Sequence, residues 1–374
     1  MVLPLKKEKE LVDIKDANFD FFGTNIGFNI PYGMNEARFY PQTQKGIENF
    51  FNLASVSPHE DLLKYIKSVC EDLHLNDWGK YLLIKKMGKS IFPIEDDARL
   101  FTWFIFNKLG YALRVGLVEK HVLVMYASEK IIYATPSYFI DKKSFYILSQ
   151  YAKGKIGKIF TYEKNYPEAN KYFDLALQTL PTFVANKERK SIHFTKENKK
   201  YRINYTYNKN VIDFMATYPQ ADYETYFNAP LEDTTYKEIA KQLKLIVDTK
   251  RSSVAIDFLL SFVQNAFAYE VDATQFSREK VMFAQETLFY DKSDCEDRAI
   301  LFAYLVRAIL NIGVVGVKYK DHMATALYIP MQGDSVRVGS KKYIIADPTY
   351  INASIGQSMP KYKRVKPEGF ILLH

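Results

Sequence analysis

The chain has 374 residues and a formal charge of +8, from 51 Lys and Arg against 43 Asp and Glu. Its composition, 48% hydrophobic and 25% charged, is that of a globular chain and excludes both wholesale disorder and a fibrous repeat. A chain of this length predicts two or three domains, each with its own core.

No apolar run in the sequence approaches the roughly 20 residues that cross a bilayer. The charged first ten residues contain no apolar core of an export signal. We therefore expect no membrane insertion and, as written, a cytoplasmic chain. A leader removed before the sequence begins would instead be consistent with the cell envelope.

Residues 1–50 are predicted to form an N-terminal arm or strands. Their segment FDFFGTNIGFNIPYG is punctuated by Gly and Pro, which is typical of short strands separated by turns. Further along, Cys70 lies in YIKSVCEDLHL, and no matching His and Asp segments follow it at a suitable distance. We therefore expect Cys70 to pack inside a helix.

Two stretches of the sequence share one order of elements. The later stretch begins with the turn SDCEDRA and continues as a helix over Ala299–Leu310, then as strands at 314–317, from His322 and at 342–346. The earlier stretch reads IEDDARLFTWFIFNKLG, then RVGLV, then a strand from His121, then KIIYATPSY. The amphipathic helix, the Gly and the three strands recur in both, which indicates an internal duplication.

Alignment of the two stretches on the Gly after each helix places Phe92 where Cys295 stands. The match of TPSY with DPTY places Thr135 where Asp347 stands. Only the histidine is kept, at His121. The first copy is therefore predicted to lack thiol chemistry.

Residues 151–230 are predicted to be a β-rich middle segment. Between positions 186 and 210 the sequence carries eight Lys and Arg against two Glu, and apolar residues alternate around the turn TKENKK, which is the pattern of a hairpin. Charged edges of this kind keep a hairpin from aggregating. A nucleic-acid interface would require the stripe to join other bases in space, and we expect no nucleic-acid partner.

Two helices are predicted at the start of the last segment, residues 231–374. The first covers 233–248 and carries its apolar residues on one side, and the second covers 252–268 and is rich in Phe and Leu. We expect both to pack behind the helix that follows Cys295.

Cys295 is predicted to lie in the first turn of that helix. Ser293 and Glu296 have the spacing of a capping box, and unpaired N–H groups at a helix start favour a thiolate over a thiol. The neighbouring carboxylates, Asp294, Glu296 and Asp297, oppose this effect. Because neighbours in a helix point about 100° apart, we expect Asp294 and Glu296 to face away from the sulfur.

Nucleophilic thiol catalysis requires a base that accepts the proton and an acceptor that orients the base. His322 begins one predicted strand and Asp347 ends the next, so their side chains can share one face if the strands pair. The backbone N–H of Cys295 is one candidate oxyanion donor, and we take Gln264, in SFVQNAFAY, as a candidate second donor.

These segments resemble the core of the transglutaminase-like superfamily, a papain-related group. The resemblance rests on ETLFYDKSDCEDRAILFAYLVRAIL, DHMATALYIP and KYIIADPTY, in that order. It implies an α+β fold in which an antiparallel sheet packs on the helix bearing Cys295, with His322 as general base and acid and Asp347 as the orienting carboxylate. Residues 51–150 resemble the same core as a degenerate module. Met323 departs from the aromatic residue that often follows the histidine in such families.

The resemblance implies acyl transfer from a peptide or protein amide through a thioester. Hydrolysis by water would make the protein a peptidase or amidase, and an amine acceptor would make it a cross-linking transglutaminase. We expect hydrolysis, and the first alternative is a catalytically silent interaction or scaffold protein. We expect no cofactor and no metal site, because the remaining histidines form no metal-ligand spacing. They are His59, His74, His193 and His374.

Overall fold

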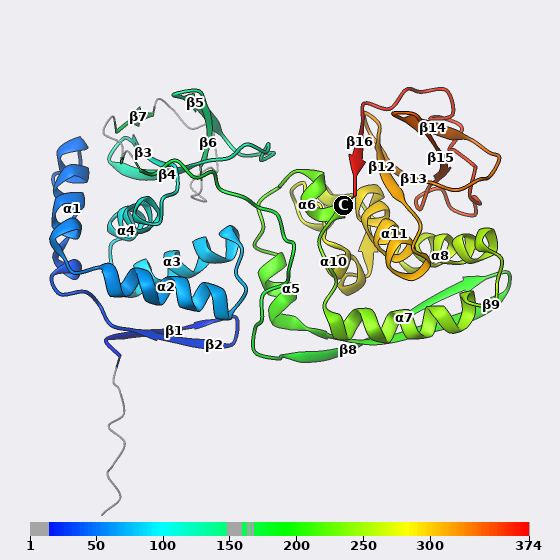
Figure 1. Cartoon of the computed structure of the whole chain (residues 1–374), viewed down its shortest axis with the longest axis horizontal. Coiled ribbons are helices and arrows are strands. Elements are labelled where there is room, and N and C mark those ends of the chain that lie inside the picture. The colour runs from blue at the N-terminus through cyan, green and yellow to red at the C-terminus, as the bar shows by residue number, and fades with distance from the viewer. Residues whose placement is uncertain (1–14, 148–158, 163–165, 167, 374) are drawn as a thin grey trace, which may run out of the picture.

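The computed structural model describes residues 15–147, 159–162, 166 and 168–373, and shows a mixed α+β protein (Figure 1). The predicted α+β class is confirmed. None of the helices in these ranges combines the length and the apolar surface that crossing a membrane requires.

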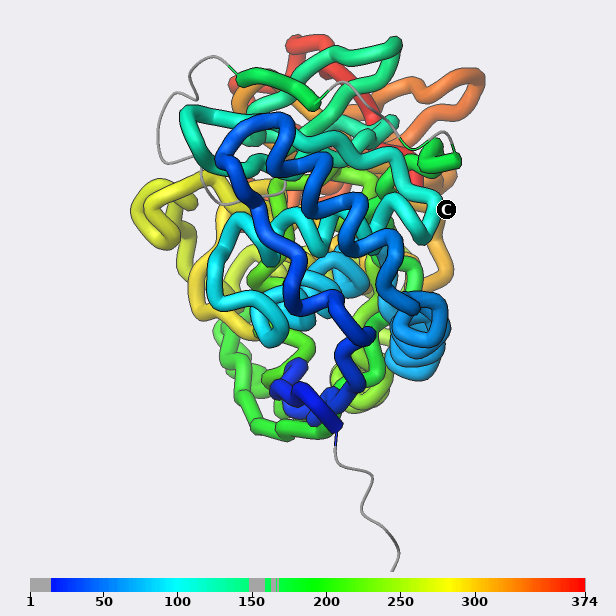
Figure 2. Tube along the Cα trace, turned by 90° about the vertical axis from the view of Figure 1, so that its left-hand side faces the viewer, coloured from blue at the N-terminus to red at the C-terminus, as the bar shows by residue number. Residues whose placement is uncertain are grey.

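The N-terminal half is layered, with a hairpin at one end, helices in the middle and a five-stranded antiparallel sheet at the other end (Figures 1 and 2). The hairpin joins β1 (Ala17–Phe21) to β2 (Thr24–Phe28), as predicted for the first fifty residues. The helices are η1 (Met34–Glu36), α1 (Gln44–Val56), α2 (Glu60–Asp72), α3 (Asp77–Ile91) and α4 (Glu95–Lys108). The sheet contains β3 (Leu113–Val118), β4 (His121–Ala127), β5 (Ser137–Ile140), β6 (Lys143–Ile147) and β7 (Phe160–Thr161).

The C-terminal half repeats these layers (Figure 1). Its hairpin joins β8 (Lys187–Lys196) to β9 (Lys199–Asn208). Its helices are α5 (Lys209–Met215), α6 (Tyr223–Phe227), α7 (Asp233–Val247), α8 (Ser252–Ala266), α9 (Asp272–Gln275), α10 (Ala284–Phe289) and α11 (Cys295–Leu310). The strands are β10 (Ala268–Tyr269) and β11 (Lys292–Ser293), which pair in parallel, and the sheet strands β12 (Val314–Lys318), β13 (Met323–Leu327), β14 (Ser335–Val338), β15 (Lys341–Ala346) and β16 (Gly369–Leu372).

The two sheets have the same order of strands. The N-terminal order is β5-β6-β4-β3-β7 and the C-terminal order is β14-β15-β13-β12-β16. The helices correspond as well, because α3 contacts both β1 and α4 just as α8 contacts both β8 and α11. This common arrangement supports the internal duplication and extends it to the hairpins, which the sequence comparison did not include.

An aspartate in each half shows which positions of the two halves correspond. Asp97, in the first turn of α4, accepts a hydrogen bond from the backbone N–H of Phe39 at 2.7 Å. Asp297, in the first turn of α11, accepts one from the backbone N–H of Met282 at 2.8 Å. Each aspartate is the third residue of its helix and accepts a backbone N–H from an earlier part of the chain, so the two positions correspond.

This register corrects two sequence expectations. Matching the aspartates places Glu95, not Phe92, where Cys295 stands. Counting from the following Gly failed because α4 has 14 residues and α11 has 16. Thr135 is not the counterpart of Asp347 either, because it precedes β5, whereas β6 is the counterpart of β15. The true counterpart follows β6, outside the described residues.

The basic hairpin lies within the C-terminal half. Its predicted turn and alternation are confirmed by the pairing of β8 with β9. Side chains of α7 cover the outer edge of β9, where Glu238 accepts from the N–H of Thr206 at 2.6 Å and Glu232 accepts from that of Asn208 at 2.9 Å. The described part of segment 151–230, predicted to be β-rich, contains β7, this hairpin and the two short helices α5 and α6.

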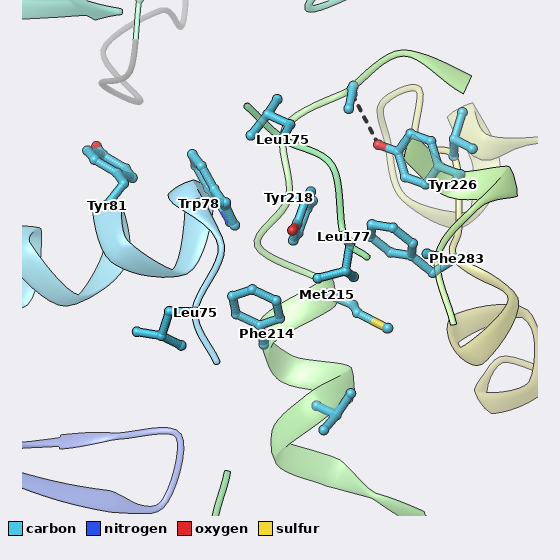
Figure 3. Close-up of a cluster of buried hydrophobic side chains, with 14 of the residues drawn as sticks. Leu75, Trp78, Tyr81, Leu175, Leu177, Phe214, Met215, Tyr218, Tyr226 and Phe283 are labelled. Atoms are coloured by element: carbon cyan, nitrogen blue, oxygen red, sulfur yellow. Dashed lines mark hydrogen bonds between the residues drawn. The ribbon is translucent and has the colours of Figure 1, made fainter. Parts of the chain in front are cut away.

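The two halves share one hydrophobic core. At their joint, the ring of Trp78 on α3 lies 5.9 Å from that of Tyr218, which lies 5.0 Å from that of Phe283 (Figure 3). The indole N–H of Trp78 also donates to the hydroxyl of Thr217 at 2.9 Å. Buried aromatic contacts of this kind hold the halves in a defined relation.

The two predicted helices of the last segment form as α7 and α8, with ends within two residues of those expected. Helix α8 packs directly on α11, as predicted. Helix α7 packs mainly on β9, and it reaches α11 through the hydroxyl of Tyr236, which donates to the carbonyl of Ala308 at 2.9 Å.

Candidate active site

Cys295 is the first residue of α11, in the first turn as predicted. The residue that caps the helix is Asp294, which forms a capping box with Asp297, and the N–H of Asp294 donates to Asp297 Oδ2 at 3.2 Å. The predicted box of Ser293 and Glu296 is therefore wrong by one position. Ser293 lies in β11 instead, because this short strand pairs with β10 up to the residue before the cap.

His322 and Asp347 are brought together by the pairing of β13 with β15. Thr325 pairs with Ala346, so the histidine before β13 and the aspartate after β15 meet at one end of the sheet. Nε2 of His322 lies 2.8 Å from Asp347 Oδ2, with the two side chains 5% and 3% exposed. The other oxygen of Asp347 accepts the N–H groups of Thr349 at 2.9 Å and of Tyr350 at 3.2 Å. These three contacts hold the carboxylate in place.

The thiol lies beside the histidine segment. The backbone N–H of Met323, the residue after His322, points at the Cys295 sulfur. Helix α11 packs on β12 and β13, so the helix start and the start of β13 face each other. Sequence reasoning anticipated this meeting of a helix start with two strand ends.

Two aromatic rings fix the plane of the imidazole, and sequence reasoning missed both. The ring of Tyr362 stacks on that of His322 with centroids 4.7 Å apart and an angle of 12° between planes. The ring of Tyr319 lies 6.3 Å away at 19°. Tyr362 is held in turn by its hydroxyl, which donates to Asp321 at 3.0 Å. Tyr362 lies forty positions after the histidine, in a loop with no motif that indicates this contact.

The carboxylates beside Cys295 are not directed away from it, which corrects the sequence expectation. The thiol donates a hydrogen bond to Glu296 Oε2 at 3.1 Å. Burial raises the pKa of this thiol, and the negative charges of Glu296 and Asp294 raise it further. These effects outweigh the helix start and the Met323 N–H, so the thiol is protonated in this arrangement.

Gln264 does not have the geometry of an oxyanion donor. Its amide nitrogen donates to the carbonyls of Asp347 at 3.2 Å, Tyr350 at 2.8 Å and Ala353 at 3.1 Å. Those contacts leave no amide hydrogen for a substrate oxygen. The buried Gln264 side chain instead anchors the loop after Asp347 to the end of α8.

Five carboxylates gather beside the thiol, from Asp272, Glu279, Asp294, Glu296 and Asp297. Within the described residues, they make up every group of three or more His, Cys, Asp or Glu side chains close enough to share one metal ion. We refer to them as the carboxylate cluster. Sequence reasoning tested only histidine spacing and did not find it, although the run of acids around Cys295 was a visible signal.

The corresponding position of the N-terminal half is built differently. His121 Nδ1 lies 3.0 Å from Asp96 Oδ2, on α4 itself. Glu95 occupies the position of Cys295, so this half has no thiol at its helix start. The sequence expectation that the first copy lacks thiol chemistry agrees with this arrangement, although the residue in question is Glu95.

No protein-family model, no curated protein and no solved structure matches this chain.

Proposed function

We propose that this protein catalyses cysteine-dependent acyl transfer on peptide or protein amides, with water as the acceptor. The observation that carries the proposal is the buried hydrogen bond between His322 and Asp347 beside a thiol at a helix N-terminus. Such an arrangement supplies a nucleophile, a base and a group that orients the base. The antiparallel sheet packed on α11 is also the arrangement that the transglutaminase-like resemblance implies.

The first chemical step transfers the thiol proton to His322. Since Nε2 is engaged by Asp347, Nδ1 is the ring nitrogen left for this exchange. The sulfur attacks the amide carbonyl carbon, and the carbonyl oxygen takes the negative charge. The carbon–nitrogen bond then breaks, the imidazolium returns its proton to the leaving amine, and a thioester on Cys295 remains.

The second step releases the acyl group. His322 accepts a proton from water, and the resulting hydroxide oxygen attacks the thioester carbon. The carbon–sulfur bond then breaks to give a carboxylic acid, and the imidazolium returns its proton to the leaving thiolate, which restores the thiol. Asp347 stabilises the imidazolium in both steps, and the stacked Tyr362 keeps the ring in its plane. The backbone N–H of Cys295 is a candidate oxyanion donor, because a helix start leaves this group without an intrahelical carbonyl.

The contact of the thiol with Glu296 favours a second candidate function. A thiol that donates to a carboxylate is a weaker nucleophile than a thiolate. If Glu296 keeps this contact when a peptide is bound, the protein is a silent interaction protein that retains the fold. An amine acceptor in place of water would give cross-linking from the same thioester.

The test is mass spectrometry of the whole protein after exposure to a panel of peptide amides, with and without added amines. We expect an acyl adduct on Cys295 in the wild type and in Cys70→Ala, and none in Cys295→Ala. Loss of the adduct to water alone indicates hydrolysis, and transfer to the amine indicates cross-linking. The proposal is contradicted if the folded wild type forms no adduct and turns over no amide. It is also contradicted if the adduct forms on Cys70 instead of Cys295.

A further inference from the structure

The outer face of the hairpin formed by β8 and β9 carries positive charge. The apolar residues that alternate along both strands face the core and are buried, as Ile192 and Ile203 are. The residues between them point outward and include Arg189 on β8 and Lys200 and Arg202 on β9. The outer face therefore presents bases from both strands to the solvent.

These bases do not protect the edge of a strand. Charged residues on an open edge hinder pairing with another chain, but α7 lies along β9 and covers its edge (Figure 1). Gln242 on α7 accepts from the N–H of Asn204 at 3.0 Å and donates to the carbonyl of the same residue at 2.6 Å. Because Arg189 and Arg202 point out of the face of the hairpin, edge protection does not account for them.

The corresponding hairpin of the N-terminal half has no base. Between Ala17 and Phe28, the ends of β1 and β2, the sequence contains one charged residue, Asp20. The repeated scaffold thus forms with a hairpin that carries no Lys or Arg. We infer that the bases of β8 and β9 are not required by the fold and belong to a function of the C-terminal half.

The bases of the hairpin meet a base of α7 around one hollow, which we call the basic hollow. It has a volume of about 600 Å³ and is lined by β8, β9 and α7. Arg189, Arg202 and Lys241 line it, and none of the three forms an ion pair with an acid among the residues that the structure describes. The other charged groups of the lining are engaged, Lys190 in an ion pair and Glu238 with a backbone N–H. Three positive charges are therefore left for a partner.

Arg202 is held in one orientation across the hairpin. Its Nε donates to Asn204 Oδ1 at 2.8 Å, and its Nη2 donates to Ser191 Oγ at 3.2 Å. The Ser191 hydroxyl donates in turn to the same oxygen of Asn204 at 2.7 Å. A guanidinium has five N–H donors, so most of them remain for a carboxylate, which a guanidinium binds through two parallel hydrogen bonds.

We propose that the basic hollow binds an acidic segment of the protein substrate in an extended conformation. The identity of this partner as the substrate rests on the proposed function, whereas the binding itself does not. Lys200 and Arg202 are two residues apart on one strand, a distance of about 7 Å along it. Alternate side chains of an extended peptide have the same spacing, so its carboxylates can face successive bases.

A nucleic acid fits this surface less well. Proteins that bind single strands stack the bases of the nucleic acid on exposed aromatic rings. In this fully described hairpin every aromatic side chain faces the core, and none lies on the outer face. They are Phe194, Tyr201, Tyr205 and Tyr207. Charge without a stacking surface favours an acidic polypeptide.

The experiment measures the fluorescence anisotropy of a labelled ten-residue peptide of alternating Glu and Ser, titrated with the full-length Cys295→Ala variant. We expect binding that weakens about tenfold or more between about 50 and 500 mM salt, because salt screens exposed charges. The same peptide with Gln in place of Glu is expected not to bind. Use of Cys295→Ala keeps the measurement independent of acyl transfer.

A double variant and a matched control locate the binding. Arg202→Gln combined with Lys241→Gln is expected to lower the affinity for the acidic peptide by about tenfold, since each exposed charge contributes a few-fold. Lys237→Gln removes a base of the same helix that lies outside the basic hollow and pairs with Asp233. This control is expected to stay within twofold of the unsubstituted protein. Circular dichroism shows that each variant is folded.

Three results overturn the proposal. The first is no binding of the acidic peptide by the folded protein at millimolar concentration, and the second is equal affinity of the double variant. The third is tighter binding of an oligonucleotide that depends on Arg202 and Lys241, which would assign the basic hollow to nucleic acid.

Turnover by the wild type tests whether the partner is the substrate. A peptide amide extended by the acidic segment is expected to have a KM about fivefold lower than the same amide without it, at a similar kcat. An unchanged KM overturns the identification of the partner as the substrate. If the acidic peptide binds but neither amide reacts, the proposed function fails and the binding by the basic hollow stands.

Discussion

The two halves of this molecule share a scaffold and differ in the partner of one histidine. In the N-terminal half His121 bonds to Asp96, on the helix. In the C-terminal half His322 bonds to Asp347, which directly follows strand β15, and the helix start presents Cys295. The common strand order therefore accounts for the fold, and under the proposed function a few side chains at one end of the sheet would make the two halves differ in chemistry.

Burial separates the two histidines as clearly as their partners do. The side chain of His121 is 47% exposed, whereas that of His322 is 5% exposed and stacked on Tyr362. Asp96 is buried as Asp347 is, so the difference between the two pairs lies in the histidine, which in the N-terminal half stays half exposed to solvent. The buried pair is held in one geometry by its surroundings, which is the property that a catalytic base requires.

The largest expected effect comes from replacing each histidine in turn, which tests whether the two histidines differ in function. His322→Ala is expected to lower acyl transfer by about 10²- to 10⁴-fold, because the proton acceptor is lost. His121→Ala, the matched control, is expected to leave the rate within twofold of the wild type. The measurement is the rate of acyl-adduct formation or amide turnover by each folded variant. Equal losses in the two variants would show that the histidines act structurally.

A smaller effect tests the shared scaffold. Asp97→Ala removes the acceptor for the buried N–H of Phe39 and is expected to lower the free energy of unfolding by about 1–3 kcal/mol. Urea unfolding followed by circular dichroism measures this change. Asp61→Ala, which replaces an exposed acid of α2, is the control and is expected to leave the midpoint unchanged. An unchanged urea midpoint for Asp97→Ala would show that this aspartate does not stabilise the scaffold that the two halves share.

The smallest expected effect concerns the two thiols. Burial raises the pKa of Cys70 to about 12, so this thiol is protonated at pH 8 and shielded by its helix. We expect no alkylation of Cys70 in the native protein and complete alkylation after unfolding. Peptide mapping of Cys295→Ala, whose remaining cysteine is Cys70, measures this directly. Native-state labelling of Cys70 would contradict its role in packing.

Local patterns in the sequence predicted much of the fold. The alternation around TKENKK predicted β8 and β9, and the apolar spacing at 233–248 and 252–268 predicted α7 and α8. The first-turn position of Cys295 followed from the capping-box spacing of Ser293 and Glu296 before an apolar helix, although the box itself lies one residue later. These features depend on neighbours in the chain, so a single sequence contains the information that they need.

Register and side-chain direction were harder to predict. Phe92 and Thr135 were wrong counterparts because helix length and hairpin loops differ between the halves. The direction of Glu296 was wrong because rotation around a helix does not determine where a flexible side chain finds a donor. Gln264 was predicted to donate a hydrogen bond to a substrate oxygen, but its amide donates instead to three carbonyls of a loop that is distant in the sequence.

The residue pattern was enough to predict the α+β class and the candidate residues Cys295, His322 and Asp347 in their chain order. The hydrogen bond of His322 to Asp347, the stacking of Tyr362 on the imidazole and the meeting of Asp272 with the acids of α11 emerged with the folded structure. The physical reason is that hydrogen bonding, stacking and charge repulsion act over a few ångströms. Residues far apart in the chain reach those distances only when strands pair and helices pack.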